Sequence, residues 1–296
     1  MARKLKISQP IAIKELEIAT KNRVTTSLIG KYKSTFKGRG LEFDGYRAYT
    51  PDDDASMIDF KASARSDTLL VKQFVEERNL NLFILMDISQ SMLTTSTKKI
   101  KIEYAAEVAA TIGQTVIESG DNLGYSLFSE DSISGFDLQN NIDVINFFLN
   151  DLSNPSNFGG AFNFNKALEY IIENIPEYSL VIIISDFIYI GDEWLDNFRI
   201  CSAKYDLIGI MVRDPLDLTL PQSSSQIVVS DPYTGEKMLI EPKRFKKRYE
   251  EEIKKELDYF KETFKENSSD LLILRTDENF LIKLINFFNE RALRWK

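Results

Sequence analysis

The sequence predicts an α/β protein built on a doubly wound, mostly parallel sheet. From residue 79 onward, short continuous apolar runs alternate with longer amphipathic segments. Continuous apolar runs are typical of strands buried on both faces of a parallel sheet, and their alternation with helices indicates βαβ units. The predicted strands are Leu80–Asp87, Leu123–Phe128, Leu180–Ser185, Asp206–Val212 and Leu271–Arg275.

Four segments predict helices, and one predicts a hairpin. Good helix formers fill residues 99–119, with apolar side chains on more than one side, so this helix should pack between the sheet and its neighbours. Apolar spacings of three and four predict helices at residues 165–174, 243–267 and 278–290. Residues 225–241 read as two short strands around a Pro-Tyr-Thr-Gly turn, which predicts an inserted β-hairpin.

Charge separates the chain into two regions. Residues 1–40 contain ten Lys and Arg against two Glu, a balance of +8, whereas the whole chain has a net charge of −8. We expect residues 1–77 to form a basic appendage of irregular and β structure, with one helix near residues 10–20, and residues 78–296 to form the α/β domain. The basic segment should pack on this acidic domain rather than bind nucleic acid, because no base-reading pattern accompanies the charge.

Composition excludes several classes of function. The chain contains no His, which excludes a Ser-His-Asp hydrolase. Its single cysteine, Cys201, excludes an internal disulfide. We also see no apolar segment that resembles a signal peptide, and the longest apolar runs are too short to span a bilayer. We therefore expect a cytoplasmic protein with no membrane span.

The stretch "LFILMDISQSM" carries the main candidate site. A buried strand ends at Asp87, and Ser89 and Ser91 follow at alternate positions. Ligands of open α/β sheets collect outside the carboxyl ends of the strands, and one carboxylate with two hydroxyls is a set of oxygen ligands that suits Mg²⁺. The competing interpretation is that these side chains cap a helix or hydrogen-bond to backbone N–H groups in the turn.

Asp-x-Ser-x-Ser after an apolar strand resembles the start of the metal-ion-dependent adhesion site of von Willebrand factor type A domains. The resemblance implies a site for Mg²⁺ or Mn²⁺ that a later Asp and a Thr complete. Asp186, after "LVIIIS", matches the Asp. The loop expected to carry the Thr has Gly159 and Gly160 followed by Ala161, so that ligand is missing, and Asn163 is a candidate substitute.

A longer stretch, residues 33–92, resembles domain-of-unknown-function family 58, whose members carry a type A domain behind a short N-terminal region. Matching residues include Arg47, Asp53, Asp59 and Arg65, whereas Asp52 stands where Gly is usual. The other departures are Ser56, where Arg is common, and Phe60, where Trp is common. With the hairpin and the C-terminal helices included, the resemblance extends over nearly the whole chain.

This family resemblance implies a non-enzymatic partner of a MoxR-type AAA+ ATPase, acting in chaperone-like assembly or activation of other proteins. No small-molecule substrate is implied. The metal site would then offer an open coordination position to an acidic residue of the partner.

Two alternatives remain open from the residues. The first is a metal-independent scaffold in which the site has degenerated and loops bind the partner directly. The second is a hydrolase or phosphotransferase with Asp87 as nucleophile, although Ser89 stands where a second acidic residue would be needed. Separately, we interpret the acidic run at residues 52–54 as a structural ion pair with Arg47 or Arg65, not a cation site.

Overall fold

The computed structural model describes residues 42–50, 53–66, 68–75, 79–191, 193–223 and 225–294. The chain divides into a smaller unit, Phe36–Leu80, and a larger unit that includes Asn81–Lys296. The predicted basic segment and its predicted helix lie outside the described residues.

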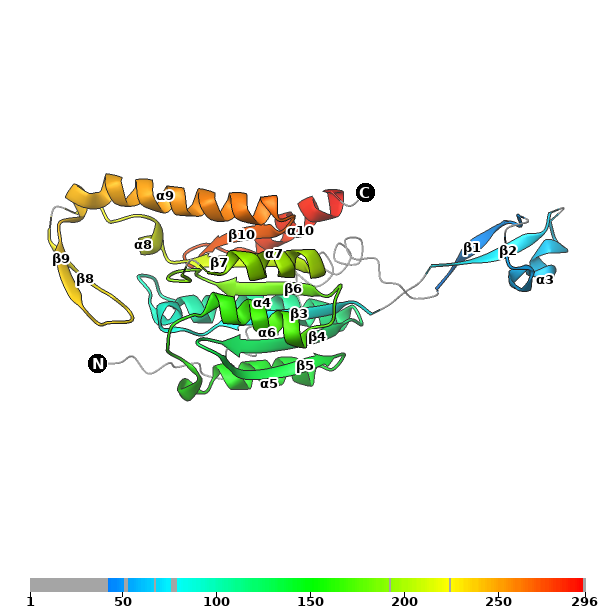
Figure 1. Cartoon of the computed structure of the whole chain (residues 1–296), viewed down its shortest axis with the longest axis horizontal. Coiled ribbons are helices and arrows are strands. Elements are labelled where there is room, and N and C mark those ends of the chain that lie inside the picture. The colour runs from blue at the N-terminus through cyan, green and yellow to red at the C-terminus, as the bar shows by residue number, and fades with distance from the viewer. Residues whose placement is uncertain are drawn as a thin grey trace. The chain divides into compact units, whose positions relative to one another are not determined.

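A six-stranded sheet forms the centre of the larger unit (Figure 1). In spatial order its strands are β10 (Asp270–Arg275), β7 (Asp206–Arg213), β6 (Leu180–Ser185), β3 (Asn81–Asp87), β4 (Asn122–Phe128) and β5 (Ser132–Gln139). The strands from β10 to β4 run parallel, and β5 pairs antiparallel with β4. The predicted fold class and the five predicted strands are confirmed.

Helices cover both faces of this sheet, which is why its central strands are continuously apolar. On one face, Phe83 and Ile183 pack in a core with α6 (Phe164–Asn174), α7 (Leu195–Lys204) and the end of α9 (Pro242–Glu266). The opposite face carries α4 (Lys101–Glu118), with α5 (Asp143–Leu152) and α10 (Phe280–Arg294) beside it. The ring of Tyr104 on α4 meets that of Phe280 on α10 edge-on, with 5.6 Å between centroids.

The strand β5 and the helices α5, α7 and the short α8 (Pro215–Leu218) of the larger unit are absent from the sequence prediction. β5 is an edge strand that buries only alternate residues, so its sequence lacks the continuous apolar run of the parallel strands. In α7 only Phe198 and Cys201 are fully buried, which leaves a weak apolar stripe in the sequence. The four predicted helices are confirmed as α4, α6, α9 and α10.

The connections change direction beside β3. From β3 the chain crosses one face through α4 to reach β4, and later crosses the other face through α6 to reach β6. β3 therefore has β4 on one side and β6 on the other. Such a reversal creates a crevice outside the carboxyl ends of the two strands where it occurs, here β3 and β6.

The predicted hairpin is confirmed as β8 (Ile227–Ser230) and β9 (Lys237–Ile240), which pair antiparallel. It lies in the chain between α8 and α9. In Figure 1 the hairpin, in yellow, lies at the end of the larger unit where α8 also lies, which is the end at which β7 finishes.

In the smaller unit, β1 (Glu42–Ala48) pairs antiparallel with β2 (Leu70–Val75), and the short helices η2 (Ala55–Met57) and α3 (Phe60–Ser63) lie between them in the chain. Asp54 and Asp59 cap these helices through backbone N–H groups. The guanidinium of Arg47 donates to both oxygens of Asp53 at 2.6 and 2.5 Å, which confirms the predicted ion pair.

Candidate functional site

The two predicted carboxylates lie at the carboxyl ends of neighbouring strands. Asp87 is the last residue of β3, and Asp186 follows the last residue of β6, to which β3 is directly paired. Both side chains are completely buried, as are those of Ser89 and Ser91 in the loop after β3. The switch point of the sheet therefore holds two carboxylates and two hydroxyls.

Hydrogen bonds from both loops hold the carboxylate of Asp87. One oxygen accepts the backbone N–H of Ser89 at 2.8 Å, and the other accepts the hydroxyl of Ser185 at 2.6 Å. Ser185 itself accepts the backbone N–H of Phe187 at 2.9 Å. Asp87 thus tightens the turn, as the turn interpretation predicts, and it also joins the loop after β3 to the loop after β6.

The serine hydroxyls have a different role from capping. Ser89 precedes the short helix η3 (Gln90–Leu93), but its side chain makes no capping hydrogen bond. Its oxygen lies 3.2 Å from the hydroxyl oxygen of Ser91. Two buried hydroxyl oxygens therefore converge beside the carboxylates, an arrangement that the capping interpretation does not require.

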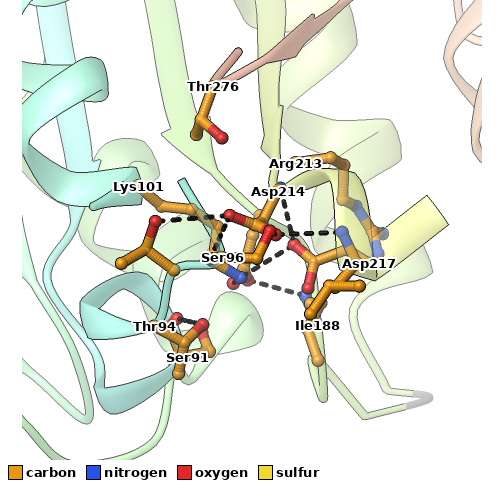
Figure 2. A network of polar contacts seen from close by, with 12 residues as sticks. Ser91, Thr94, Ser96, Lys101, Ile188, Arg213, Asp214, Asp217 and Thr276 are labelled. Atoms are coloured by element: carbon orange, nitrogen blue, oxygen red, sulfur yellow. Dashed lines mark hydrogen bonds and ion pairs between the residues drawn. The ribbon is translucent and has the colours of Figure 1, made fainter. Parts of the chain in front are cut away.

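A buried lysine neutralises Asp186. Lys101, at the start of α4, is 1% exposed, and its ammonium lies 2.6 Å from Asp186 Oδ2 and 3.0 Å from Asp217 Oδ2. The second oxygen of Asp186 accepts the backbone N–H of Ile188 at 3.0 Å. Lys101 and its partner Asp217 are drawn in Figure 2. The backbone N–H of Asp214 donates to Asp217 at 2.8 Å, which orients the second partner of the lysine.

The electrostatics leave an excess of buried negative charge. Burial, and after it the nearby charge of Asp186, raise the pKa of Asp87 to about 7, against the hydrogen bonds from Ser185 and Ser89, which lower it. Burial lowers the pKa of Lys101, but the charges of Asp186 and Asp217 outweigh it, so the net shift is upward. Within the described part of the chain, Asp87 has no ion-pair partner of its own.

The loop that contains Gly159, Gly160 and Ala161 contacts the loop after β3 through backbone hydrogen bonds. The carbonyl of Gly160 accepts the N–H of Gln90 at 3.0 Å, and Gly159 donates to the carbonyl of Ile88 at 3.1 Å. Gly160 has a φ of +71°, and a Cβ there would lie 3.1 Å from Glu130 Oε1, so this position suits glycine. The backbone N–H of Ala161 points to the same Glu130 oxygen at 3.4 Å.

Asn163 is used as a helix cap. Its side-chain oxygen accepts the backbone N–H of Lys166 at 3.0 Å, at the start of α6. This is a different role from the substitute metal ligand that the sequence suggests, and the ligand role stays a prediction. Ala161 supplies no side-chain oxygen, so the hydroxyl that the type A site would use is missing at that position.

Three residues near the two carboxylates were not predicted from the sequence: Lys101, Ser185 and Tyr233. Lys101 is one of several lysines in a charged stretch, and nothing local marks it as buried. Ser185 is adjacent to Asp186 and could have been found from the same strand end. Tyr233 lies at the tip of the β8–β9 hairpin, far from the other site residues in sequence, so only the fold brings it there.

The hydroxyl of Tyr233 is shielded from solvent and has no hydrogen-bond partner within the described residues. Burial raises the pKa of Tyr233, whereas the hydroxyls of Ser91 and Ser89 lower it and the charges of Asp186 and Asp87 raise it. The two serines are therefore near this hydroxyl, although no hydrogen bond of good geometry joins them.

The donor set fits a hard divalent cation. Hydroxyl and carboxylate oxygens are the ligands that Mg²⁺ accepts, and Mg²⁺ retains several waters, so few protein ligands suffice. A cation would also balance the charge of Asp87, which is otherwise expensive to bury. Ser89, Ser91, Asp87 and Asp186 are the residues that would hold it. Clusters of three or more Asp, Glu, Cys or His side chains suited to a metal are absent from the described ranges.

The chain matches a described protein family over most of its length. The model of the family described as "Protein of unknown function DUF58" matches residues 45–258. An uncharacterised protein of Mycobacterium tuberculosis is 24% identical over 285 residues, which cover 95% of this chain and 89% of that protein. An uncharacterised protein of Mycobacterium bovis has the same identity and coverage.

Solved structures have weaker similarity. The conserved hypothetical protein BatB from Bacteroides thetaiotaomicron is 14% identical, with a TM-score of 0.49 over 73% of this chain and 100% of that chain. A von Willebrand factor type A protein from Catenulispora acidiphila is 12% identical, with a TM-score of 0.42 over 75% of this chain and 44% of that chain. Among the helices of the described ranges, none has the length and apolar character needed to cross a membrane.

Proposed function

The chain belongs to the DUF58 family, and we propose that it is a non-enzymatic protein-interaction module that recognises an acidic residue of its partner through a divalent metal ion. The observation that carries this proposal is the buried pair Asp87 and Asp186 beside two converging serine hydroxyls. The single positive charge of Lys101 is shared between Asp186 and Asp217, and a bound cation would balance the charge of Asp87.

Each residue has a distinct role in the proposal. Ser89 and Ser91 provide neutral oxygens to Mg²⁺ or Mn²⁺, and Asp87 provides the compensating charge. Asp186, held by Lys101 and by the backbone of Ile188, orients a bound water. A bound metal would supply a positive charge to which a carboxylate of the partner would bind.

The partner in this proposal is a MoxR-type AAA+ ATPase, and the setting is the cytoplasm. Support for the partner comes from the resemblance of the chain to its family, and the metal site adds the chemistry by which an acidic surface would be bound. The proposal includes no small-molecule substrate, no nucleic acid and no turnover.

Calorimetric titration of Mg²⁺ and Mn²⁺ into the chelator-stripped protein tests the metal site. We expect saturable binding that Asp87→Ala abolishes, because that substitution removes the only carboxylate of the site without an internal cation. Asp196→Ala is the matched control: it removes a carboxylate that is 92% exposed on α7, and metal binding should be unchanged. Absence of binding in the unaltered protein, or equal binding in both variants, would contradict the proposed site.

A second function, the metal-independent scaffold, is favoured by one specific observation. The ammonium of Lys101 already provides a cation 2.6 Å from Asp186, and Ala161 lacks the hydroxyl that the type A site would use. In this case the loops would bind the partner directly. Partner binding measured with and without chelator separates the two functions: the metal-dependent one requires loss of binding in chelator, whereas the scaffold requires unchanged affinity.

A further inference from the structure

The hydroxyl of Tyr233 is buried at a polar site. It is shielded from solvent and unpaired within the described residues. Leaving a buried hydroxyl without a partner is costly, so such groups are normally satisfied by water, an ion or a ligand. Around it lie the hydroxyls of Ser89 and Ser91 and the charges of Asp87 and Asp186.

The hairpin tip is built to hold this ring in place. The carboxylate of Asp231 accepts the backbone N–H groups of Tyr233 and Thr234, both at 2.8 Å, which fixes the turn. The Tyr233 ring packs edge-on against Tyr189, with 5.3 Å between centroids. Tyr189, in the loop after Asp186, also donates its hydroxyl to Asp231 at 3.4 Å. The tip is therefore attached to the loop that carries the second carboxylate.

Tyr189 itself has a strained backbone that presents its ring to the hairpin. Its φ is +60°, a left-handed conformation that is unusual for an aromatic residue, and Phe187 nearby has a φ of +51°. Strain of this kind persists only where surrounding contacts hold it and is concentrated at functional sites. The loop after β6 is thus shaped both to bring Asp186 to the site and to receive the hairpin tip.

We infer that Tyr233 is a further residue of the metal site, whose hydroxyl donates a hydrogen bond to a water bound to the cation at Ser89 and Ser91. This inference rests on the proposed metal site. Because Mg²⁺ retains several of its waters, an outer hydrogen-bond donor is useful where a protein ligand is missing, as it is at Ala161. Removing an outer partner of this kind typically weakens metal binding 10- to 100-fold.

The role of the hydroxyl makes the hairpin part of the site. The strands β8 and β9 on either side of this tip are largely exposed, with Val228 62% and Met238 67% exposed.

The test compares Tyr233→Phe with Tyr189→Phe by calorimetric titration of Mg²⁺ and Mn²⁺ into the full chain. Both variants keep the ring and lose one hydroxyl, that of Tyr233 in the hairpin tip or that of Tyr189 in the loop against which the tip packs. We expect Tyr233→Phe to weaken metal binding about 10- to 100-fold and Tyr189→Phe to change it less than about twofold, because the latter loses only a long hydrogen bond to Asp231.

Thermal unfolding provides a second measurement that does not depend on the fitted affinity. Without metal, Tyr233→Phe should unfold at the same or a higher temperature than the unaltered protein, because it removes an unsatisfied buried hydroxyl. At a Mg²⁺ concentration that saturates the unaltered protein, metal binding should stabilise the variant less than it stabilises the unaltered protein. A general packing defect would instead lower the unfolding temperature in both conditions.

The outcomes separate this inference from the proposed function. If the unaltered protein binds metal, Asp87→Ala does not, and Tyr233→Phe binds as tightly as the unaltered protein, then only the role of Tyr233 is overturned. Equal losses in Tyr233→Phe and Tyr189→Phe would assign the effect to packing of the tip and also overturn it. If the unaltered protein binds no metal, the proposed site and the role of Tyr233 are both overturned.

Discussion

At the scale of single residues, the site depends on how buried charges are paired. Asp186 and Lys101 form a buried ion pair 2.6 Å apart, and Asp217 shares the same ammonium. Asp87 is equally buried but receives only neutral hydrogen bonds, from Ser89 and Ser185. One carboxylate is thus satisfied within the protein and the other is not, and this asymmetry distinguishes a candidate cation site from a purely structural cluster.

The pH dependence of stability should reveal this asymmetry. Native Asp87 has a pKa of about 7, raised by burial and by the charge of Asp186. The unfolded chain loses this proton near pH 4, so between about pH 4 and pH 7 the native state binds more protons than the unfolded state. The stability that this group contributes is present at low pH and is lost as pH rises through that window. Because a shift of one pKa unit corresponds to about 1.4 kcal/mol, the free energy of unfolding should fall by up to about 4 kcal/mol.

Urea unfolding of chelator-stripped protein and of Asp87→Asn, from pH 4.5 to about pH 8, measures this effect. We expect the stability of the unaltered protein relative to Asp87→Asn to fall as pH rises, because the amide cannot ionise. Saturating Mg²⁺ should reduce that fall if a cation balances the carboxylate. Parallel pH profiles for the two metal-free proteins would contradict the raised pKa of Asp87.

At the scale of elements, a hairpin of marginal size is ordered by its tip. β8 and β9 are four residues each, and an isolated two-stranded hairpin is marginally stable in water. Most of their side chains are exposed, so their own packing contributes little. The contacts of Asp231, Tyr233 and Tyr189 are therefore what we expect to hold the hairpin against the site.

Asp231→Ala should release this tip. The substitution removes the acceptor of two backbone N–H groups in the turn, and loss of a cap of this kind costs about 1 kcal/mol. Metal affinity should then fall in the same direction as in Tyr233→Phe, since the hydroxyl is no longer held at the site. Glu236→Ala, which removes an exposed carboxylate from the same turn, serves as control in the same titration. A fall of similar size in both variants would indicate loss of charge rather than loss of the turn.

At the scale of the larger unit, ion pairs from the last helix join the two strands at one side of the sheet. Arg291 on α10 is 1% exposed and donates to both oxygens of Asp206, at the start of β7, at 2.6 and 2.7 Å. It also binds Asp270, at the start of β10. These contacts lie at the amino ends of the strands, opposite the end that carries Asp87 and Asp186, so they support the fold without forming part of the site.

Arg291→Met should therefore destabilise the protein without altering metal binding. Breaking a buried ion pair by removing one partner costs about 3 to 5 kcal/mol, because the remaining carboxylates lose their counter-charge. Arg294→Met is the control, since Arg294 pairs with the same Asp270 but its side chain is 58% exposed, and exposed pairs contribute about 1 kcal/mol or less. Denaturant unfolding measures both variants; equal stability losses would argue against the buried network.

Elements with a strong local signal were predictable from the sequence. The parallel strands are continuous apolar runs because both faces are covered, and α9 shows its apolar stripe at helical spacing. The edge strand β5 and the helix α7 were missed because each buries only part of its surface, so the pattern is weak. Asp87, Ser89 and Ser91 could be predicted as a group because one short loop carries all three.

The sequence by itself determined the fold class, the ends of the central strands and the oxygen-rich loop after β3, because these follow from local periodicity and short spacing. Only the tertiary structure decided that Lys101 neutralises Asp186, that Asn163 caps a helix, and that the hydroxyl of Tyr233 reaches the site. These contacts join residues far apart in the chain, and burial, which sets their charges and hydrogen bonds, arises only when the sheet and its loops assemble.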